Sequence, residues 1–241
     1  GDISGFGDEV NINQVGDVTI GDYVPNTTTV SAEQLTSTQQ KLLIDQSKYF
    51  AFYVDDVDSA QTKPKVMDEA IRRSARGLSG AADNFAAGVF DSGAGLSGPL
   101  AASLAVNDVP DYMGTIRQSL HEADNDPDEG MFIVVPPWLE KLILISFQGN
   151  TESAEVQANG RVGQYYGLNV FTSNNTPTDT GDDVIIAGTM RGATMAEQIL
   201  STEAYRPESS FSDAVKGLHV YGAKVVESNA VLRSTASANV T

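Results

Sequence analysis

The feature that most constrains this chain is an aromatic, strand-like run followed, after a cluster of aspartates, by a long helical repeat. Between residues 41 and 54 the apolar side chains fall on alternate positions, as in a β-strand: Leu42, Ile44, Phe50, Phe52 and Val54. A strand of about 14 residues is ~45 Å long, about as wide as a compact globule of 241 residues. The sequence therefore predicts a strand that crosses the whole molecule.

A helical repeat follows over residues 62–90. Its apolar side chains recur every three or four residues, at Met67, Ile71, Ala75, Leu78, Ala82, Phe85 and Val89. Thr62 can cap this helix, and Pro64 fits its first turn. At ~1.5 Å per residue the helix is ~40 Å long. Because one globule cannot cover two elements of this length, both are expected to need neighbouring copies over their apolar faces.

The remaining patterns predict an α+β protein. Alternation on both sides of Gly16-Asp17 predicts a two-residue β-hairpin over residues 8–24. The other elements are expected in this order: an extended segment at 28–37, a Gly-, Ser- and Ala-rich connection at 91–107, a helix at 109–123, a strand from 131, a helix at 138–147, strands at 161–171 and 183–188, a helix at 192–200, and strands at 202–213 and 217–226.

Charge and composition exclude several classes of protein. The 32 acidic and 15 basic residues give a formal net charge of −17, which argues against a broad nucleic-acid-binding surface. It suits an ordinary acidic surface or a protein that lives in high salt. The absence of cysteine excludes disulfides and thiolate chemistry. Apolar runs such as residues 142–147 are too short to span a membrane, and no segment resembles a signal peptide. Since residue 1 is glycine, a processed product or part of a longer precursor is expected.

Two loops match ligand-binding motifs only in part. GAGLSG, at 93–98, fits G-x-G-x-x-G, but a helix precedes it and Pro99 follows it, which favours a flexible linker over a cofactor site. DNDPDEG, at 124–130, begins like a calcium loop. However, Glu129 stands where the turn glycine belongs and Val135 where the closing glutamate belongs, so a solvated loop is favoured.

Catalytic and metal-binding signatures are missing from the sequence. His121 and His219 lack a partner at metal-ligand spacing, and no G-x-S-x-G elbow surrounds a serine. We therefore expect no catalytic residue, no cofactor and no metal.

One stretch, at the start of the long helix, is locally basic. Such a stretch is usually a solvated helix face, but it would contact DNA if it lined an enclosed genome. The residues expected to face DNA in that case are Lys63, Lys65, Arg72, Arg73 and Arg76.

The order of segments resembles that of the major capsid proteins of tailed double-stranded DNA phages and viruses, which have the Hong Kong 97-type fold. GDEVNINQVGDVTIGDYVPNTTTV through LLIDQSKYFAFYVDDVDSAQ is similar to their hairpin-and-strand region. MFIVVPPWLEKLI followed by GRVGQYYGLNVFTSNN resembles their strand, helix and strand series. FSDAVKGLHVYGAKVVESNAVLR resembles their closing segment, so the likeness covers nearly the whole chain.

The resemblance implies four parts. Residues 1–56 would form an N-terminal segment and an extended loop over a neighbouring subunit, and 57–104 a spine helix and peripheral domain. Residues 105–200 would form an axial domain, and 201–241 would return through the peripheral sheet to a C-terminal axial segment. Val10, Ile12, Val18 and Ile20 would lie in the inter-subunit loop, with Phe50 and Phe52 as its anchor.

The function that the resemblance implies is that of a major capsid protein. Copies would self-assemble into pentamers and hexamers of an icosahedral shell around double-stranded DNA, without sequence-specific contact. Assembly would take place in the host cytoplasm, and the product would be the virion, with no membrane. Portal, scaffolding and decoration proteins would be further partners. Some members cross-link a loop lysine to a neighbour's asparagine, but residues 1–40 contain no lysine, so a non-covalent shell is expected.

Two alternatives to a virus shell stay open. The same fold could form an encapsulin-like compartment around a cargo enzyme, and nucleic acid inside purified particles would argue against it. An α/β enzyme that binds a nucleotide through residues 93–98 would instead be a monomer.

Overall fold

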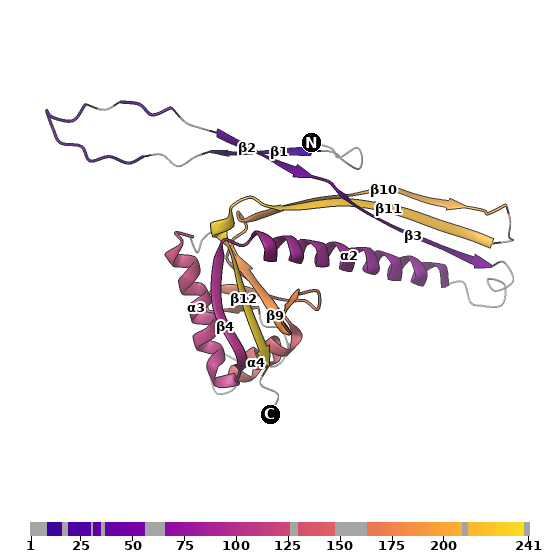
Figure 1. Cartoon of the computed structure of the whole chain (residues 1–241). Helices are drawn as coiled ribbons and strands as arrows, with labels where there is room; N and C mark the ends of the chain where they lie inside the picture. Colours follow the sequence, from indigo (N-terminus) through magenta and orange to yellow (C-terminus); the bar gives the residue numbers. More distant parts are fainter. Residues whose placement is uncertain are drawn as a thin grey trace.

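The computed structural model describes residues 9–15, 19–29, 31–34, 37–55, 66–125, 130–147, 163–208 and 212–238. The molecule is elongated and has three parts (Figure 1): a projecting arm, a long sheet lying on a helix, and a wedge of sheet and helices below one end of that helix. Two of the sheets are antiparallel and the third is mixed, with a few helices packed against them, so the predicted α+β class is confirmed.

The long helix is α2 (Val66–Gly93). Its 28 residues span ~42 Å, and it runs beneath an antiparallel sheet with the strand order β10 (Ala193–Tyr205), β11 (Ser212–Val225) and β3 (Gln46–Asp55). The aromatic rings of Phe85 on α2 and Tyr221 on β11 meet edge to face with their centroids 5.4 Å apart. The predicted cap at Thr62 and the proline of the first turn lie outside the described residues.

The aromatic strand predicted over residues 41–54 is two strands in two sheets. β2 (Ser37–Leu43) ends before Ile44-Asp45, and β3 begins at Gln46. β2 pairs with β1 (Glu9–Val15), whereas β3 pairs with β11. The single-strand prediction is wrong because alternation continues through a change of partner, and the pattern of apolar residues does not record which strand lies alongside.

The two-residue hairpin predicted over residues 8–24 is also wrong. β1 pairs antiparallel with β2, from Glu9 opposite Leu43 to Val15 opposite Ser37. Residues 19–29 belong to no strand, and the expected turn at Gly16-Asp17 lies outside the described residues. The alternating pattern identified an extended segment correctly, but the partner of β1 comes from a segment more than 20 residues further along.

The wedge is built on a third, mixed sheet of seven strands. Its order is β4 (Leu96–Leu104), β12 (Val231–Ala238), β9 (Asp182–Gly188), β5 (Phe132–Val135), β7 (Leu168–Thr172) and β6 (Gln164–Tyr165), while β8 (Thr178–Asp179) pairs with β9. Short 3-10 turns lie at Val106–Asp108 and Ser228–Ala230.

Two hydrophobic cores lie on opposite faces of this sheet. On one face, α3 (Val109–Glu122) and α4 (Pro137–Ser146) bury Met113, Ile116 and Leu139. On the other face, Val184, Ile186 and Val231 pack against Phe90 and its neighbours at the end of α2. The end of α2 therefore joins the long sheet to the wedge.

The structure corrects two further predictions and adds one strand that was not predicted. The helix expected at 192–200 is part of strand β10, because pairing with β11 along most of its length overrides the helix-forming residues there. The connection expected at 91–107 contains the end of α2 and strand β4. Strand β12, which was not predicted, pairs with β4 and β9.

The helices expected at 109–123 and 138–147 are confirmed as α3 and α4. In the part of the chain that is described, no helix is long and apolar enough to cross a membrane.

Candidate functional site

The projecting arm ends in an open loop, whose described residues are 19–29 and 31–34 (Figure 1). Its tip is a tight turn, in which the amide of Thr27 donates to the carbonyl of Val24 at 3.2 Å and Asn26 has a φ of 63°. Proline at position 25 and asparagine with positive φ are the residues that a type II turn favours. Further down, the amide of Thr19 donates to the carboxylate of Glu33 at 3.1 Å. The loop thus has a defined shape although its described residues form no strand.

The loop exposes apolar side chains that nothing in its own chain covers. Ile20 is 96% exposed, and Tyr23 and Val24 are also largely exposed. Residues 1–40 contain neither lysine nor arginine, so the charged side chains of the loop are all acidic. An apolar, acidic loop held away from the body has the composition of an interaction surface.

The ribbon of β1 and β2 is fixed to the long sheet where it crosses β11. Leu42 and Ile44 are buried there. A Cβ added to Gly222 would lie 2.1 Å from the carbonyl oxygen of Leu43, so only glycine allows this approach. The Lys224 ammonium donates to the carbonyl of Lys41 at 3.0 Å. The alternating pattern predicts Leu42 and Ile44 on one face of a strand but does not indicate this crossing.

The predicted loop anchors lie on the opposite face of the same sheet. Phe50 and Phe52 are half-buried and stacked, with ring centroids 6.1 Å apart. A Cβ on Gly217 would lie 2.4 Å from the Phe50 ring, which therefore covers β11 on its α2 side. Phe50 and Phe52 pack on the α2 side of the long sheet, and their role as loop anchor stays a prediction.

The other predicted loop residues are not gathered at one place. Val10 and Ile12 are half-buried on β1, opposite Leu42 and Gln40 of β2. Ile20 lies in the open loop, and Val18 is outside the described residues. The predicted set therefore divides between the ribbon and the loop.

The basic stretch forms an exposed face on the first half of α2. The side chains of Arg72 and Arg73 are each 80% exposed. Both pair with Glu69, at 2.8 and 3.0 Å. Arg76 is exposed as well, and Lys63 and Lys65 lie outside the described residues. One carboxylate shared by two guanidinium groups leaves this face with excess positive charge.

A pocket of about 460 Å³ lies between α2 and the long sheet, near the edge strand β10. Its lining is mostly apolar and includes Phe50, Ile71, Leu78 and Ile199. His219 also lines it and is buried, with its Nε2 3.3 Å from the Glu197 carboxylate. The other histidine, His121, accepts a hydrogen bond from Arg117 Nε at 3.2 Å on the same helix. Over the described ranges, no three His, Cys, Asp or Glu side chains could together hold a metal ion.

The GAGLSG segment is a packed junction and not a flexible linker. A Cβ on Gly93 would lie 2.5 Å from Val225, one on Gly95 2.8 Å from the backbone of Ser228, and one on Gly98 2.7 Å from Leu232. The amide of Gly95 donates to the carbonyl of Ser228 at 2.9 Å. The linker prediction is therefore wrong, because the glycines are there for close packing between chain segments.

The acidic DNDPDEG segment also begins at this junction. Asp124 has a φ of 58°, and the buried side-chain amide of Asn125 donates to the carbonyls of Leu120 and Asn229 at 3.0 and 2.9 Å. The four residues that follow Asn125 lie outside the described part of the chain, so the solvated loop stays a prediction.

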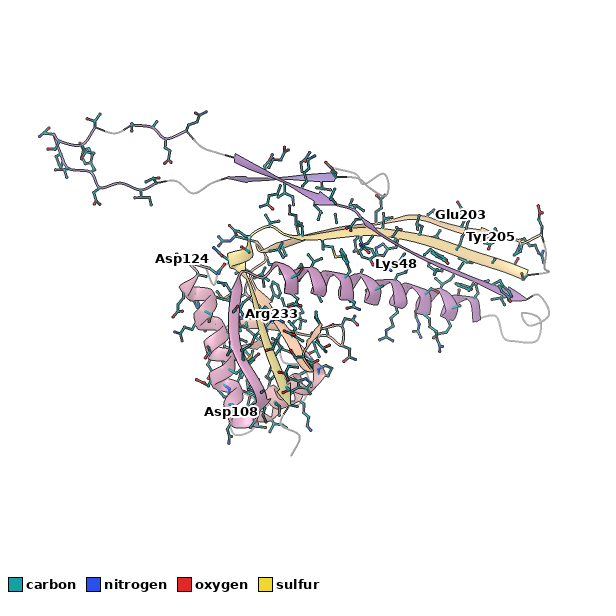
Figure 2. The ribbon with its side chains drawn as sticks, viewed as in Figure 1. Lys48, Asp108, Asp124, Glu203, Tyr205 and Arg233 are labelled. Carbon is teal, nitrogen blue, oxygen red and sulfur yellow. The ribbon has the colours of Figure 1, made fainter. Side chains whose placement is uncertain are left out.

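An arginine clamp fixes the end of α2 against the wedge. The Arg233 guanidinium on β12 donates to the carboxylates of Asp91 on α2 and Asp179 on β8; Figure 2 labels Arg233 near the end of α2. The hydrogen bond from Arg233 holds the pKa of Asp179 below its usual value, and the two carboxylates raise the pKa of Arg233. The clamp and the glycine junction together set how the long sheet meets the wedge.

The whole chain exposes far more surface than a compact monomer. Its accessible surface is 15379 Å², whereas a compact protein of 25.5 kDa exposes about 10,400 Å². The excess of about 5,000 Å² is comparable with the area buried in the largest obligate interfaces. Figure 1 shows the arm and the long sheet extending away from the wedge, as expected for a chain with this much accessible surface.

Comparison with known proteins finds similarity to phage capsid proteins. A family model described as phage capsid protein matches residues 14–234. No protein with a curated description matches. Among solved structures, a chain of Mycobacterium phage Che8 is 28% identical with a TM-score of 0.75, over 95% of this chain and 84% of that one. The capsid of the Cyanophage P-SCSP1u is 12% identical with a TM-score of 0.74, over 98% and 85%. The capsid of Ralstonia phage GP4 is 13% identical with a TM-score of 0.66, over 96% and 84%.

Proposed function

Since the chain belongs to the phage capsid protein family, we propose that it is a shell subunit whose copies self-assemble into pentamers and hexamers of an icosahedral capsid around double-stranded DNA. The observation that carries this proposal is the surface excess of about 5,000 Å² over a compact monomer. Burial of that surface between copies would drive assembly.

The proposed architecture is of the Hong Kong 97 type. The β1–β2 ribbon and its loop are the extended loop that lies over a neighbouring subunit, and α2 is the spine helix. The three-stranded sheet is the peripheral domain, and the seven-stranded sheet with α3 and α4 is the axial domain. The four parts expected from the sequence are kept, but the sheets favour different boundaries. β4 pairs with β12 in the axial sheet, and residues 193–205 pair with β11 in the peripheral sheet.

Electron microscopy and light scattering of the purified protein test the assembly. We expect MDa particles with icosahedral symmetry. A monomer of 25.5 kDa that persists at high concentration would contradict the proposal. Particles taken from their natural source should contain double-stranded DNA, and a protein cargo in its place would favour the encapsulin-like alternative.

The basic face of α2 is proposed to point inward, toward the packaged DNA. It lies on the far side of the long sheet from the ribbon (Figure 1), so a shell with the loops outside would have this helix inside. Contact through exposed arginines is electrostatic and independent of sequence. Reversing the charge of Arg72 and Arg73 to glutamate should lower the amount of DNA packaged and leave empty shells intact. Unchanged packaging would exclude this role for the helix.

A further inference from the structure

The pocket between α2 and β10 lies where the helix has only small side chains on part of its sheet-facing side. Further along α2 the Phe85 ring fills the space beneath the sheet and meets Tyr221. At the level of the pocket the helix instead presents Ala75 and Ser79. Small side chains leave this space unfilled, and its volume of about 460 Å³ is within the range of small-molecule sites.

A bulge in the edge strand β10 shapes the opposite wall of the pocket. Ile199 and Thr202 both line it, although residues three positions apart lie on opposite faces of a regular strand. The pairing of β10 with β11 shifts register between Ile199 and Ser201. The partners of Ile199 and Thr202 are then His219 and Gly217, which share the α2 face of β11. The bulge therefore turns both side chains toward the helix, and bulges with this effect are common next to functional sites.

His219 gives this apolar pocket an unsatisfied hydrogen-bonding group. The side chain lines the pocket, and the residue is 6% exposed. Its Nε2 is 3.3 Å from the Glu197 carboxylate, which can only accept, so Nε2 carries the ring proton. Nδ1 of the neutral ring is then an acceptor, and among the described residues it has no hydrogen-bond partner. Since buried polar groups are nearly always hydrogen-bonded, this nitrogen indicates a missing donor.

The walls of the pocket also expose apolar side chains. Ile199 on β10 is 64% exposed, and Ile71 on α2 is 40% exposed. A molecule bound between them would remove apolar surface of both walls from water, which favours binding.

We propose that this pocket binds a small apolar molecule that carries one hydroxyl or N–H group. The apolar body lies between α2 and β10, against Phe50, Leu78 and Ile199, and the donor bonds to Nδ1 of His219. The Glu197 carboxylate beside the ring disfavours an anionic ligand. Because every group of the site belongs to one chain, this proposal does not depend on assembly into a shell.

Equilibrium dialysis of the purified protein with 2-naphthol and with naphthalene tests the site. The two probes share one apolar body and differ in a single hydroxyl. Without a hydrogen bond to the protein, the hydroxyl would weaken binding, because it loses water when it is buried. We expect one 2-naphthol per chain and about tenfold weaker binding of naphthalene, the effect of one hydrogen bond to a buried acceptor. Equal affinities, or no saturable binding of 2-naphthol, would overturn the proposal.

A pocket-filling variant shows where the probes bind. Ala75→Phe places a ring in the pocket and should abolish the binding of both probes. Ala75 is exposed on α2, so the variant should keep its fold. Asn84→Phe is the matched control, since Asn84 is exposed on the same helix and does not line the pocket. It should bind both probes as the wild type does, and an Ala75→Phe protein with unchanged affinity for 2-naphthol would exclude the pocket as the site.

His219→Phe tests the hydrogen bond separately. The substitution keeps a ring and removes the acceptor, so the affinity for 2-naphthol should fall about tenfold, to that for naphthalene. The affinity for naphthalene should not change. A variant that still prefers 2-naphthol would show that the hydroxyl bonds to another group. Because His219 is buried, circular dichroism checks the fold of this variant, and the Ala75→Phe result stands without it.

Discussion

Replacing Gly222 with alanine tests whether the ribbon crosses the sheet as described. The new Cβ would lie 2.1 Å from the Leu43 carbonyl oxygen and 3.1 Å from the Cα of Ile44. An ordinary carbon–oxygen contact is about 3.3 Å or longer, so the ribbon backbone must move by about 1 Å. No side-chain rotation can relieve the clash, because the atoms it meets belong to the backbone.

Two responses to this clash are possible, and their costs decide between them. Detaching the ribbon would expose Leu42 and Ile44, at about 1.5–3 kcal/mol for each side chain. It would also break the hydrogen bonds made by Gln40 and Lys224, at about 0.5–1.5 kcal/mol each. A small shift that tolerates overpacking costs about 1–3 kcal/mol. The ribbon should therefore shift and stay attached, with a loss of about 1–3 kcal/mol in unfolding free energy.

Thermal unfolding of the unassembled protein measures this loss. For a chain of this size 1 kcal/mol corresponds to about 2–4 °C, so Gly222→Ala should lower the Tm by roughly 2–12 °C. Gly77→Ala is the matched control, since a Cβ at that exposed position on α2 meets nothing within 4 Å. It should raise stability by about 0.5–1 kcal/mol. A Gly222→Ala protein that melts at or above the wild-type temperature would refute the crossing.

Two other contacts make testable predictions. Arg233→Met leaves the carboxylates of Asp91 and Asp179 without their donor and should lower the midpoint of urea unfolding at pH 7. Because Arg233 lowers the folded-state pKa of Asp179, this contribution is present above the unfolded pKa near ~3.9 and is lost as pH falls through the folded value. The gap between wild type and variant should accordingly narrow in acid, and a gap independent of pH would contradict the clamp. Tyr112→Phe removes the buried hydroxyl that lies 2.7 Å from Ser234 Oγ and should cost about 0.5–1.5 kcal/mol by the same assay. An unchanged midpoint would show that this bond contributes nothing.

The two longest helices could be predicted from the sequence because their periodicity is local. The apolar residues of α2 and α3 repeat over several turns, and both helices form close to the predicted residues. The partner of β1 could not be predicted, since alternation at Val10 and Ile12 records an exposed and a covered side but not which distant strand supplies the cover.

The predictions for the junction and for strand β10 were wrong for different physical reasons. In GAGLSG the small residues suggested flexibility, but Gly93, Gly95 and Gly98 are small because another segment packs against each of them. Residues 193–200 have helix-forming composition, yet they lie in a strand because β11 offers a long partner. The ribbon crossing was missed because Gly222 carries no local signal that a backbone from residue 43 will pass over it.

The glycine junction has a consequence for how identical chains could tile a curved surface. Backbone meets backbone at Gly95 and Ser228, and the Arg233 clamp closes the same corner, so these contacts constrain the angle between the long sheet and the wedge. In the proposed shell, subunits in pentamers and hexamers would nevertheless have to bend differently toward their neighbours. We expect the adjustment to be made in the arm, which precedes Ile44 in the chain. The body of the protein would then keep one shape in every subunit, and the arms would adapt to each neighbour.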